Sequence, residues 1–157
     1  MRAELRGTNA VGTSSLAFDP TGTLLAQGGQ DNNVALWDTT TGDEVGVLVG
    51  MRSAVFGVSF SSDGLLAAGG ADNAGVIVWD VARRTQEARL QPGTTGTEPI
   101  FLPGGVLLIT DLTGIHRYDL GVDAVYERLC GLIGREMTAD EWNDYVVGRE
   151  YSSLCGT

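Results

Sequence analysis

The sequence predicts an all-β protein built from repeated four-stranded sheets, and three observations lead to this fold class. First, three features of the 157-residue chain return after 42 positions: Phe18 and Phe60, Gly22 and Gly64, Trp37 and Trp79. Second, 23 glycines with only four prolines and no Gly-X-Y period indicate many tight turns between short strands. Third, residues 76–79 are apolar on both faces, as in a strand buried between stacked sheets.

Each repeat is expected to form four strands, named a to d in chain order. In the first repeat the strands are predicted around residues 15–18, 24–28, 34–37 and 44–48. Turn-forming residues separate them at 19–22, 30–33 and 39–42. A weaker third copy begins at Pro99, and Tyr118-Asp119 takes the place of Trp-Asp with three residues lost. This copy supplies strands a, b and c, and the chain then turns helical without a strand d.

The repeats resemble the WD-repeat family. The residues that carry the resemblance are an apolar-x-Phe strand with a Gly-containing turn (16–22 and 58–64), Leu-Ala-x-Gly-Gly-like segments (25–29 and 66–70) and the closing Trp-Asp pairs. The resemblance implies a partial WD-type β-propeller of about three four-stranded blades over residues 1–120. The chain departs from the family at Gly50-Met51, where Gly-His is expected, and neither strong repeat contains a histidine. The buried Asp–His–Ser–Trp network of the family therefore cannot form, and Trp37 and Trp79 should be held by packing.

Three blades are fewer than the four to eight that usually close a propeller. Residues 2–7 look like an outer strand d whose own a, b and c are missing. Two explanations stay open: upstream blades are missing, or two copies of the chain form a six-bladed ring.

The period changes after residue 120, which predicts a short α-helical C-terminal tail of two helices over 121–157. An apolar helical stripe runs over 125–133, and Thr138-Ala139-Asp140-Glu141 fits a capping box. The tail, with Cys130, Trp142, Tyr145 and Cys155, is similar to that of bacterial STAND-type NTPases and related WD-repeat regulators. This similarity implies a sensor or regulatory terminus. The chain contains no Walker motif, so nucleotide chemistry would lie outside it.

Composition narrows the classes of partner. The net charge is −10 and all ten basic residues are arginine, which disfavours binding to a phosphate backbone. Apolar runs are too short for a membrane span, and the N-terminus lacks the apolar stretch of a signal peptide. We expect a cytoplasmic protein. Cys130 and Cys155 are too few for a disulfide framework or a zinc cage, and two buried thiols are favoured over a bond.

The candidate site residues are better explained by structural roles. Trp37 and Trp79 are expected between blades, and Trp142 with Tyr145 in the docking of a tail helix onto the propeller. Three aspartates (Asp31, Asp38 and Asp72) are expected to bind local backbone groups instead of cations. The stretch 93–97 lacks the Lys-Ser/Thr of a phosphate loop and should connect blades. The only histidine, His116, is expected on a strand pressed between blades, with no nucleophile or orienting carboxylate implied by spacing.

The sequence therefore predicts a non-catalytic protein-interaction scaffold without catalytic, cofactor-binding or metal-binding residues. Its partners are expected to be proteins, with neither nucleic acid nor membrane among them. The alternative is that the chain is the regulatory C-terminal part of a larger bacterial STAND-type NTPase or transcriptional regulator. A propeller enzyme would require a cluster of histidine and acidic residues, and the chain contains one histidine.

Overall fold

The computed structural model describes residues 12–92 and 96–121, and this part of the chain is all-β. The chain divides into two compact units, Met1–Tyr118 and Asp119–Thr157. The predicted strand at residues 2–7 and the two-helix tail lie outside the described residues, as do Cys130, Trp142, Tyr145 and Cys155. No helix within the described ranges is long and apolar enough to cross a membrane.

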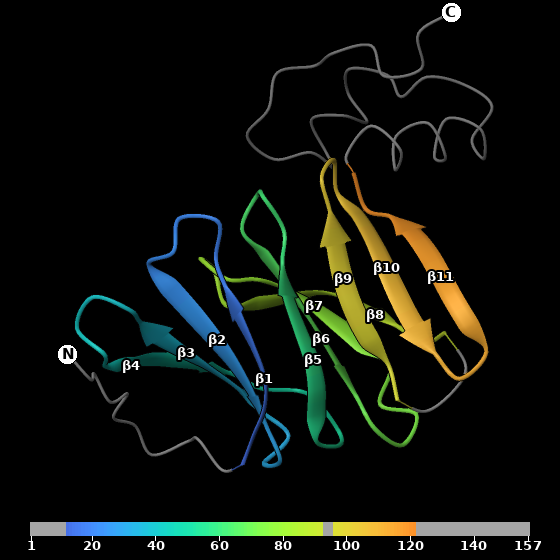
Figure 1. The fold of residues 1–157 in the computed structure, drawn as a ribbon, viewed down its shortest axis with the longest axis horizontal. Coiled ribbons are helices and arrows are strands. Elements are labelled where there is room, and N and C mark those ends of the chain that lie inside the picture. Colours follow the sequence, from blue (N-terminus) through green and yellow to red (C-terminus); the bar gives the residue numbers. More distant parts are fainter. Residues whose placement is uncertain (1–11, 93–95, 122–157) are drawn as a thin grey trace, which may run out of the picture. The chain divides into compact units, whose positions relative to one another are not determined.

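Within the described residues, eleven strands form three antiparallel sheets, one for each predicted repeat (Figure 1). The first sheet contains β1 (Thr13–Phe18), β2 (Leu24–Gly29), β3 (Val34–Asp38) and β4 (Glu44–Leu48) in that order. The second contains β5 (Val55–Phe60), β6 (Leu65–Gly70), β7 (Val76–Asp80) and β8 (Thr85–Leu90). The third contains β9 (Glu98–Leu102), β10 (Val106–Asp111) and β11 (Gly114–Asp119).

The expectation of four strands is therefore confirmed for the first and second sheets. The third sheet has three strands, because the segment after β11 does not continue into a fourth described strand. This agrees with the prediction that the third copy supplies only strands a, b and c.

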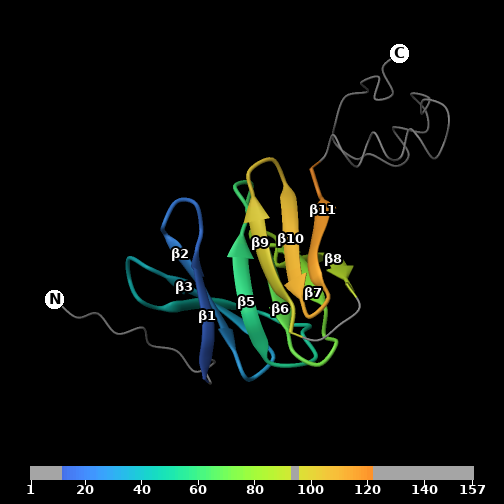
Figure 2. The same ribbon diagram turned by 45° about the vertical axis from the view of Figure 1, so that its right-hand side comes forward.

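The first strands of the three sheets lie side by side, as both views show (Figures 1 and 2). A serine hydroxyl joins each pair: the backbone N–H of Val58 donates to Ser15 Oγ at 3.2 Å. Likewise, the N–H of Phe101 donates to Ser59 Oγ at 2.9 Å. Sheets in chain order with adjacent first strands are the arrangement expected of propeller blades.

The hydrophobic core lies mainly between the first and second sheets. Side chains alternate across a strand, so Val34 and Leu36 of β3 share one face. They belong to the same buried cluster as Leu66, Ile77 and Trp79 of the second sheet. All four residues of the run 76–79 are at most 2% exposed, which confirms the prediction that β7 is buried on both faces.

Trp37 lies on the opposite face of the first sheet, away from the second sheet. It forms a separate buried cluster with Leu25 and Ala35 and is 1% exposed. Among the described residues its indole Nε1 has no hydrogen-bond partner, so packing holds this ring, as predicted from the missing histidine. Trp79 lies in the cluster between the first and second sheets, as expected, whereas the described residues contain no sheet on the Trp37 side of the first sheet.

The contact between the second and third sheets depends on a glycine. A Cβ built on Gly69 would lie 2.2 Å from the backbone O of Thr97, so no larger residue fits there without movement. Thr97 is fully buried, and its Oγ1 accepts the N–H of Gly70 at 3.1 Å and lies 3.0 Å from Gly75 O. Residues 93–95 of the predicted connecting stretch lie outside the described residues, whereas Thr97 at its end fixes the third sheet to the second.

Candidate functional site

The turns between strands a and b and between strands c and d lie at one end of the blades, which we call the turn end. It comprises residues 19–23, 38–43, 61–64, 80–84 and 103–105. Antiparallel strands place the a–b and c–d turns of a blade at the same end. In the first blade the Thr39 hydroxyl donates to Gly22 O at 2.7 Å, and Thr39 N–H donates to Thr23 O at 3.0 Å. In the second blade, Val81 N–H donates to Gly64 O at 3.2 Å.

Asp19 builds the first of these turns. Its carboxylate accepts the N–H of Leu24 at 2.7 Å, the N–H of Thr21 at 3.2 Å and the Thr21 hydroxyl. Gly22 closes the turn with a φ of 73°, which a residue with a side chain rarely adopts. Burial raises the pKa of Asp19, but the hydrogen bonds outweigh burial and hold the pKa below its ordinary value. Asp19 is therefore ionised at neutral pH.

Two more aspartates act in the same way after strand c. Asp38 Oδ1 accepts the N–H groups of Thr40 and Thr41 at 2.7 and 3.0 Å, and these bonds lower its pKa. Asp80 Oδ1 accepts the N–H of Arg83 at 2.9 Å, and Asp80 Oδ2 pairs with the Arg83 guanidinium. The backbone bond and then the side-chain bond of Arg83 lower the pKa of Asp80. The prediction of local backbone binding is confirmed for Asp38.

An apolar groove crosses the three blades at the turn end, and we call it the phenylalanine groove. One part has a volume of about 310 Å³ and is lined by Phe18, Pro20, Phe60, Ser61, Ser62, Phe101, Leu102 and Pro103. A neighbouring part of about 450 Å³ shares Pro20, Phe60 and Ser62 and extends to Asp19 and Val81. Volumes of this order are typical of ligand-binding clefts. Each described repeat contributes one phenylalanine from its first strand.

The rim of the groove is acidic. Asp19 lines it, and Asp63 lies between the lining residues Ser62 and Gly64. The a–b and c–d turns of the first two blades contain more acidic than basic residues. The five aspartates are Asp19, Asp38, Asp43, Asp63 and Asp80, and the two arginines are Arg83 and Arg84. Arg83 pairs with Asp80, and Arg84 Nη2 donates to Val45 O at 2.6 Å. Arg83 is therefore engaged within its own blade and Arg84 with β4 of the first blade, and neither arginine lines the groove, whose lining includes Asp19.

The other two aspartates behave differently from Asp38. Asp31 Oδ2 accepts the side-chain amide of Asn33 at 3.2 Å, while its buried Oδ1 has no hydrogen-bond partner in the part of the chain that the structure describes. The expected backbone bond is therefore not observed at Asp31. Asp72 is exposed with a φ of 51°, and no contact supports a backbone bond there. Within the described ranges, no group of three or more His, Cys, Asp or Glu residues could hold a metal ion.

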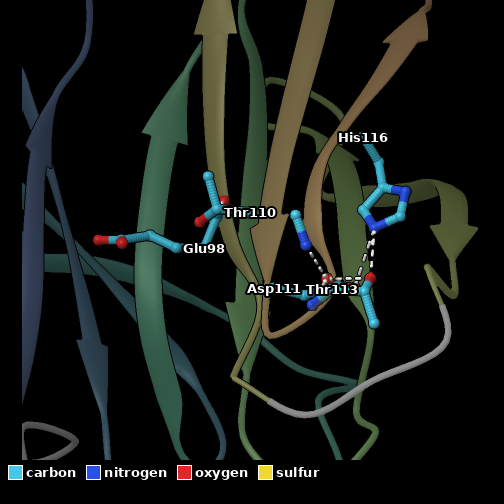
Figure 3. Close-up of polar contacts among 6 residues, drawn as sticks. Glu98, Thr110, Asp111, Thr113 and His116 are labelled. Carbon is cyan, nitrogen blue, oxygen red and sulfur yellow. Dashed lines mark hydrogen bonds and ion pairs between the residues drawn. The ribbon is translucent and has the colours of Figure 1, made fainter.

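His116 has neighbours that its sequence spacing did not reveal. Its Nε2 lies 3.2 Å from Asp111 Oδ2 and 3.1 Å from Thr113 Oγ1 (Figure 3). The expected burial between blades is wrong, because the His116 side chain is 34% exposed, whereas Ala35 and Ile77 at matching positions are at most 1% exposed. The cause is its place in β11, an edge strand of the third sheet.

The His116 cluster does not have the geometry of a catalytic relay. A relay uses one ring nitrogen for the nucleophile and the other for the carboxylate. Here Asp111 and Thr113 both contact Nε2. The Thr113 hydroxyl also donates to Asp111 Oδ1 at 2.6 Å, and this same oxygen accepts the N–H groups of Thr113 and Gly114. These contacts build the turn between β10 and β11.

Sequence reasoning missed the phenylalanine groove. The repeat of Phe18 and Phe60 was visible, and Phe101 was part of the third copy, but repeated phenylalanines indicate core as readily as surface. Only the arrangement of the first strands shows that these side chains meet at one end.

Comparison with known proteins agrees with the repeat pattern. Residues 2–38 and 42–80 match the family model of the WD domain, G-beta repeat. The Periodic tryptophan protein 2 homolog of Schizosaccharomyces pombe is 32% identical over 95 residues, which are 60% of this chain and 10% of that protein. WD repeat-containing protein 1 of Xenopus tropicalis is 37% identical over 82 residues, or 49% of this chain and 13% of that protein.

WD repeat-containing protein VIP3 of Arabidopsis thaliana is 33% identical over 75 residues, or 47% of this chain and 23% of that protein. The chain thus spans about a tenth to a quarter of the length of these curated relatives. Two solved structures share the fold: U3-55K (TM-score 0.67, 18% identity) and the WD40 repeats of RRP9 (TM-score 0.66, 19% identity). Both matches cover 74% of this chain, and 38% and 37% of the respective structures. Over residues 2–38 and 42–80 the chain is therefore similar to WD40 repeats, and it shares the fold of these two solved structures.

Proposed function

We propose that this chain is a non-catalytic scaffold that binds another protein through the turn end of its blades. WD repeats serve as protein-interaction scaffolds, and the matched repeats cover residues 2–38 and 42–80. The observation that carries the proposal is the phenylalanine groove, an open apolar surface built from matching residues of three repeats. Exposed apolar surface rimmed by polar groups is typical of protein-binding sites.

The absence of a catalytic arrangement at His116 supports a binding role. Asp111 and Thr113 share one ring nitrogen of His116, so neither is oriented as a nucleophile or a relay carboxylate. The net charge of −10 also supports a protein partner over a nucleic-acid partner.

Further blades are a second class of partner. Leu16 of the first blade is 56% exposed, and Ile100 and Ile115 of the third sheet are 45% and 71% exposed. Upstream blades of a longer protein or a second copy of the chain would cover such positions. The regulatory alternative, a terminus of a bacterial STAND-type protein, depends on the tail alone, and the relatives named above are eukaryotic WD proteins.

Site-specific photo-crosslinking tests the proposed function. A photoreactive phenylalanine analogue is introduced at Ser62 in the groove or at Ser14, which is exposed at the other end of β1. Each variant is irradiated in an extract of the cells that carry the gene. We expect discrete protein adducts with the Ser62 variant that are absent or weaker with the Ser14 variant. Equal labelling by both variants, or no adduct from Ser62, would contradict a protein-binding turn end.

A further inference from the structure

We propose that the occupant of the phenylalanine groove is a peptide segment with apolar side chains at its centre and arginine or lysine on its flanks. The inference rests on the proposed protein-binding function and specifies the chemistry of the partner. The apolar centre follows from the lining of the groove, and the basic flanks follow from its charged border.

The apolar lining of the groove favours a partner with apolar side chains. The exposed ring of Phe18, the prolines Pro20 and Pro103, and Leu102 present carbon surface to solvent, and Phe18 alone is 62% exposed. Burial of such surface contributes roughly 25 cal/mol per Å² to binding, before the costs of association. The serines Ser61 and Ser62 lie within the same lining, so the groove is amphipathic.

The acidic border of the groove favours a positively charged partner. Asp19 and Asp63 flank the groove, and no arginine lines it. Complementary charge at the rim of an interface raises the association rate and rejects partners of like charge. An acidic segment would meet both aspartates in a chain whose net charge is already −10. A basic segment is attracted by the same field.

The groove also favours an extended occupant. It runs past the first strands of three successive blades, and the serine–backbone bonds fix these strands next to one another. An occupant that reaches both Phe18 and Phe101 has to span all three first strands, as an extended segment does.

Three fluorescein-labelled eight-residue peptides test the proposal with the full 157-residue chain. The first has a Leu-Pro-Leu-Phe centre between two pairs of arginine. The second has the same centre between two pairs of glutamate. The third has a Gly-Ser-Gly-Ser centre between two pairs of arginine. Fluorescence anisotropy at physiological salt measures the binding of each.

We expect saturable micromolar binding of the first peptide, and binding at least about tenfold weaker for each of the other two. Phe18→Ser should weaken the first peptide about fivefold or more, whereas Phe56→Ser, which removes another exposed phenylalanine outside the groove, should have no effect. Asp63→Asn should weaken it about threefold, and Asp72→Asn should not. Circular dichroism establishes that each variant is folded.

Four results would overturn the inference: no binding of the first peptide at about 1 mM, equal binding of the glutamate peptide, equal binding of the Gly-Ser peptide, or equal effects of Phe18→Ser and Phe56→Ser. Each can occur while Ser62 still gives protein adducts. In that case the proposed function stands and the partner chemistry is wrong. If Ser62 gives no adducts either, both fail.

Discussion

The first and second repeats have closely similar sequences, yet the same positions of their first strands differ in exposure. Leu16 is 56% exposed, whereas Val58, 42 positions later, is 8% exposed. Phe18 is 62% exposed, whereas Phe60 packs against the buried cluster between the sheets. The local sequence does not cause this difference in exposure, because β1 and β5 have the same apolar pattern.

The difference comes from the neighbouring blade. The second sheet places Val58 and Phe60 against Ala26, Val34 and Leu36 of the first sheet. No described residue does the same for Leu16 and Phe18, which remain open. A repeat protein thus uses one motif for core or for surface according to its place in the stack.

Gly69→Ala is expected to have the largest effect on this stacking. The added Cβ would lie 2.2 Å from Thr97 O, a backbone atom that cannot move without shifting β9. We expect a loss of about 3 kcal/mol in the free energy of unfolding, measured by urea denaturation. Gly28→Ala at the matching position meets the Val55 side chain at 2.7 Å and should cost less. A larger loss for Gly28→Ala would contradict the described contact between the second and third sheets.

Phe60→Ala and Phe18→Ala test the comparison directly. Removal of the Phe60 ring from the packed cluster should cost about 2 kcal/mol, because a cavity remains. Removal of the exposed Phe18 ring should cost less than about 0.5 kcal/mol. Thermal and urea denaturation of the two variants measure the difference. Equal losses would show that the two repeats have equivalent environments.

Thr97→Val introduces at position 97 the residue type that the second repeat has 42 positions earlier, at Val55. The Thr97 hydroxyl accepts the N–H of Gly70, and a valine leaves this buried donor without its partner. We expect a loss of about 1.5 kcal/mol, since an unsatisfied buried group costs about 1–3 kcal/mol. Thr85→Val at an exposed position is the control. An unchanged stability of Thr97→Val would mean that shape alone fixes the third sheet.

The turn aspartates should give a smaller, pH-dependent effect. The folded-state pKa values of Asp19, Asp38 and Asp80 are lowered, so their stabilisation is present above the unfolded pKa near about 3.9. It is lost as the pH falls through the folded values. Urea midpoints at pH 7 and pH 3 should therefore differ less in the triple Asp→Asn variant than in the parent. An identical pH dependence would contradict the role of these hydrogen bonds.

The sequence predicted the strands well and the surface poorly. The 42-residue repeat located the first four strands to within two residues, because turn residues and alternating apolar residues mark each strand. The exposure of His116 depends on which blade is the neighbour, and no local pattern encodes that. The contacts of Asp111 and Thr113 with His116 depend on how the side chains lie in the turn between β10 and β11. The spacing of these residues in the sequence does not specify that arrangement.

Hydroxyl-radical footprinting of the intact chain tests most directly whether the first blade covers the second. Mass spectrometry reports the oxidation rates of Leu16, Phe18, Val58 and Phe60 in one sample, with the 48% exposed Phe56 as a reference. We predict that Phe18 is oxidised several-fold faster than Phe60, and Leu16 several-fold faster than Val58. Equal rates within each pair, or faster oxidation in the second repeat, would contradict stacking of these repeats as adjacent blades.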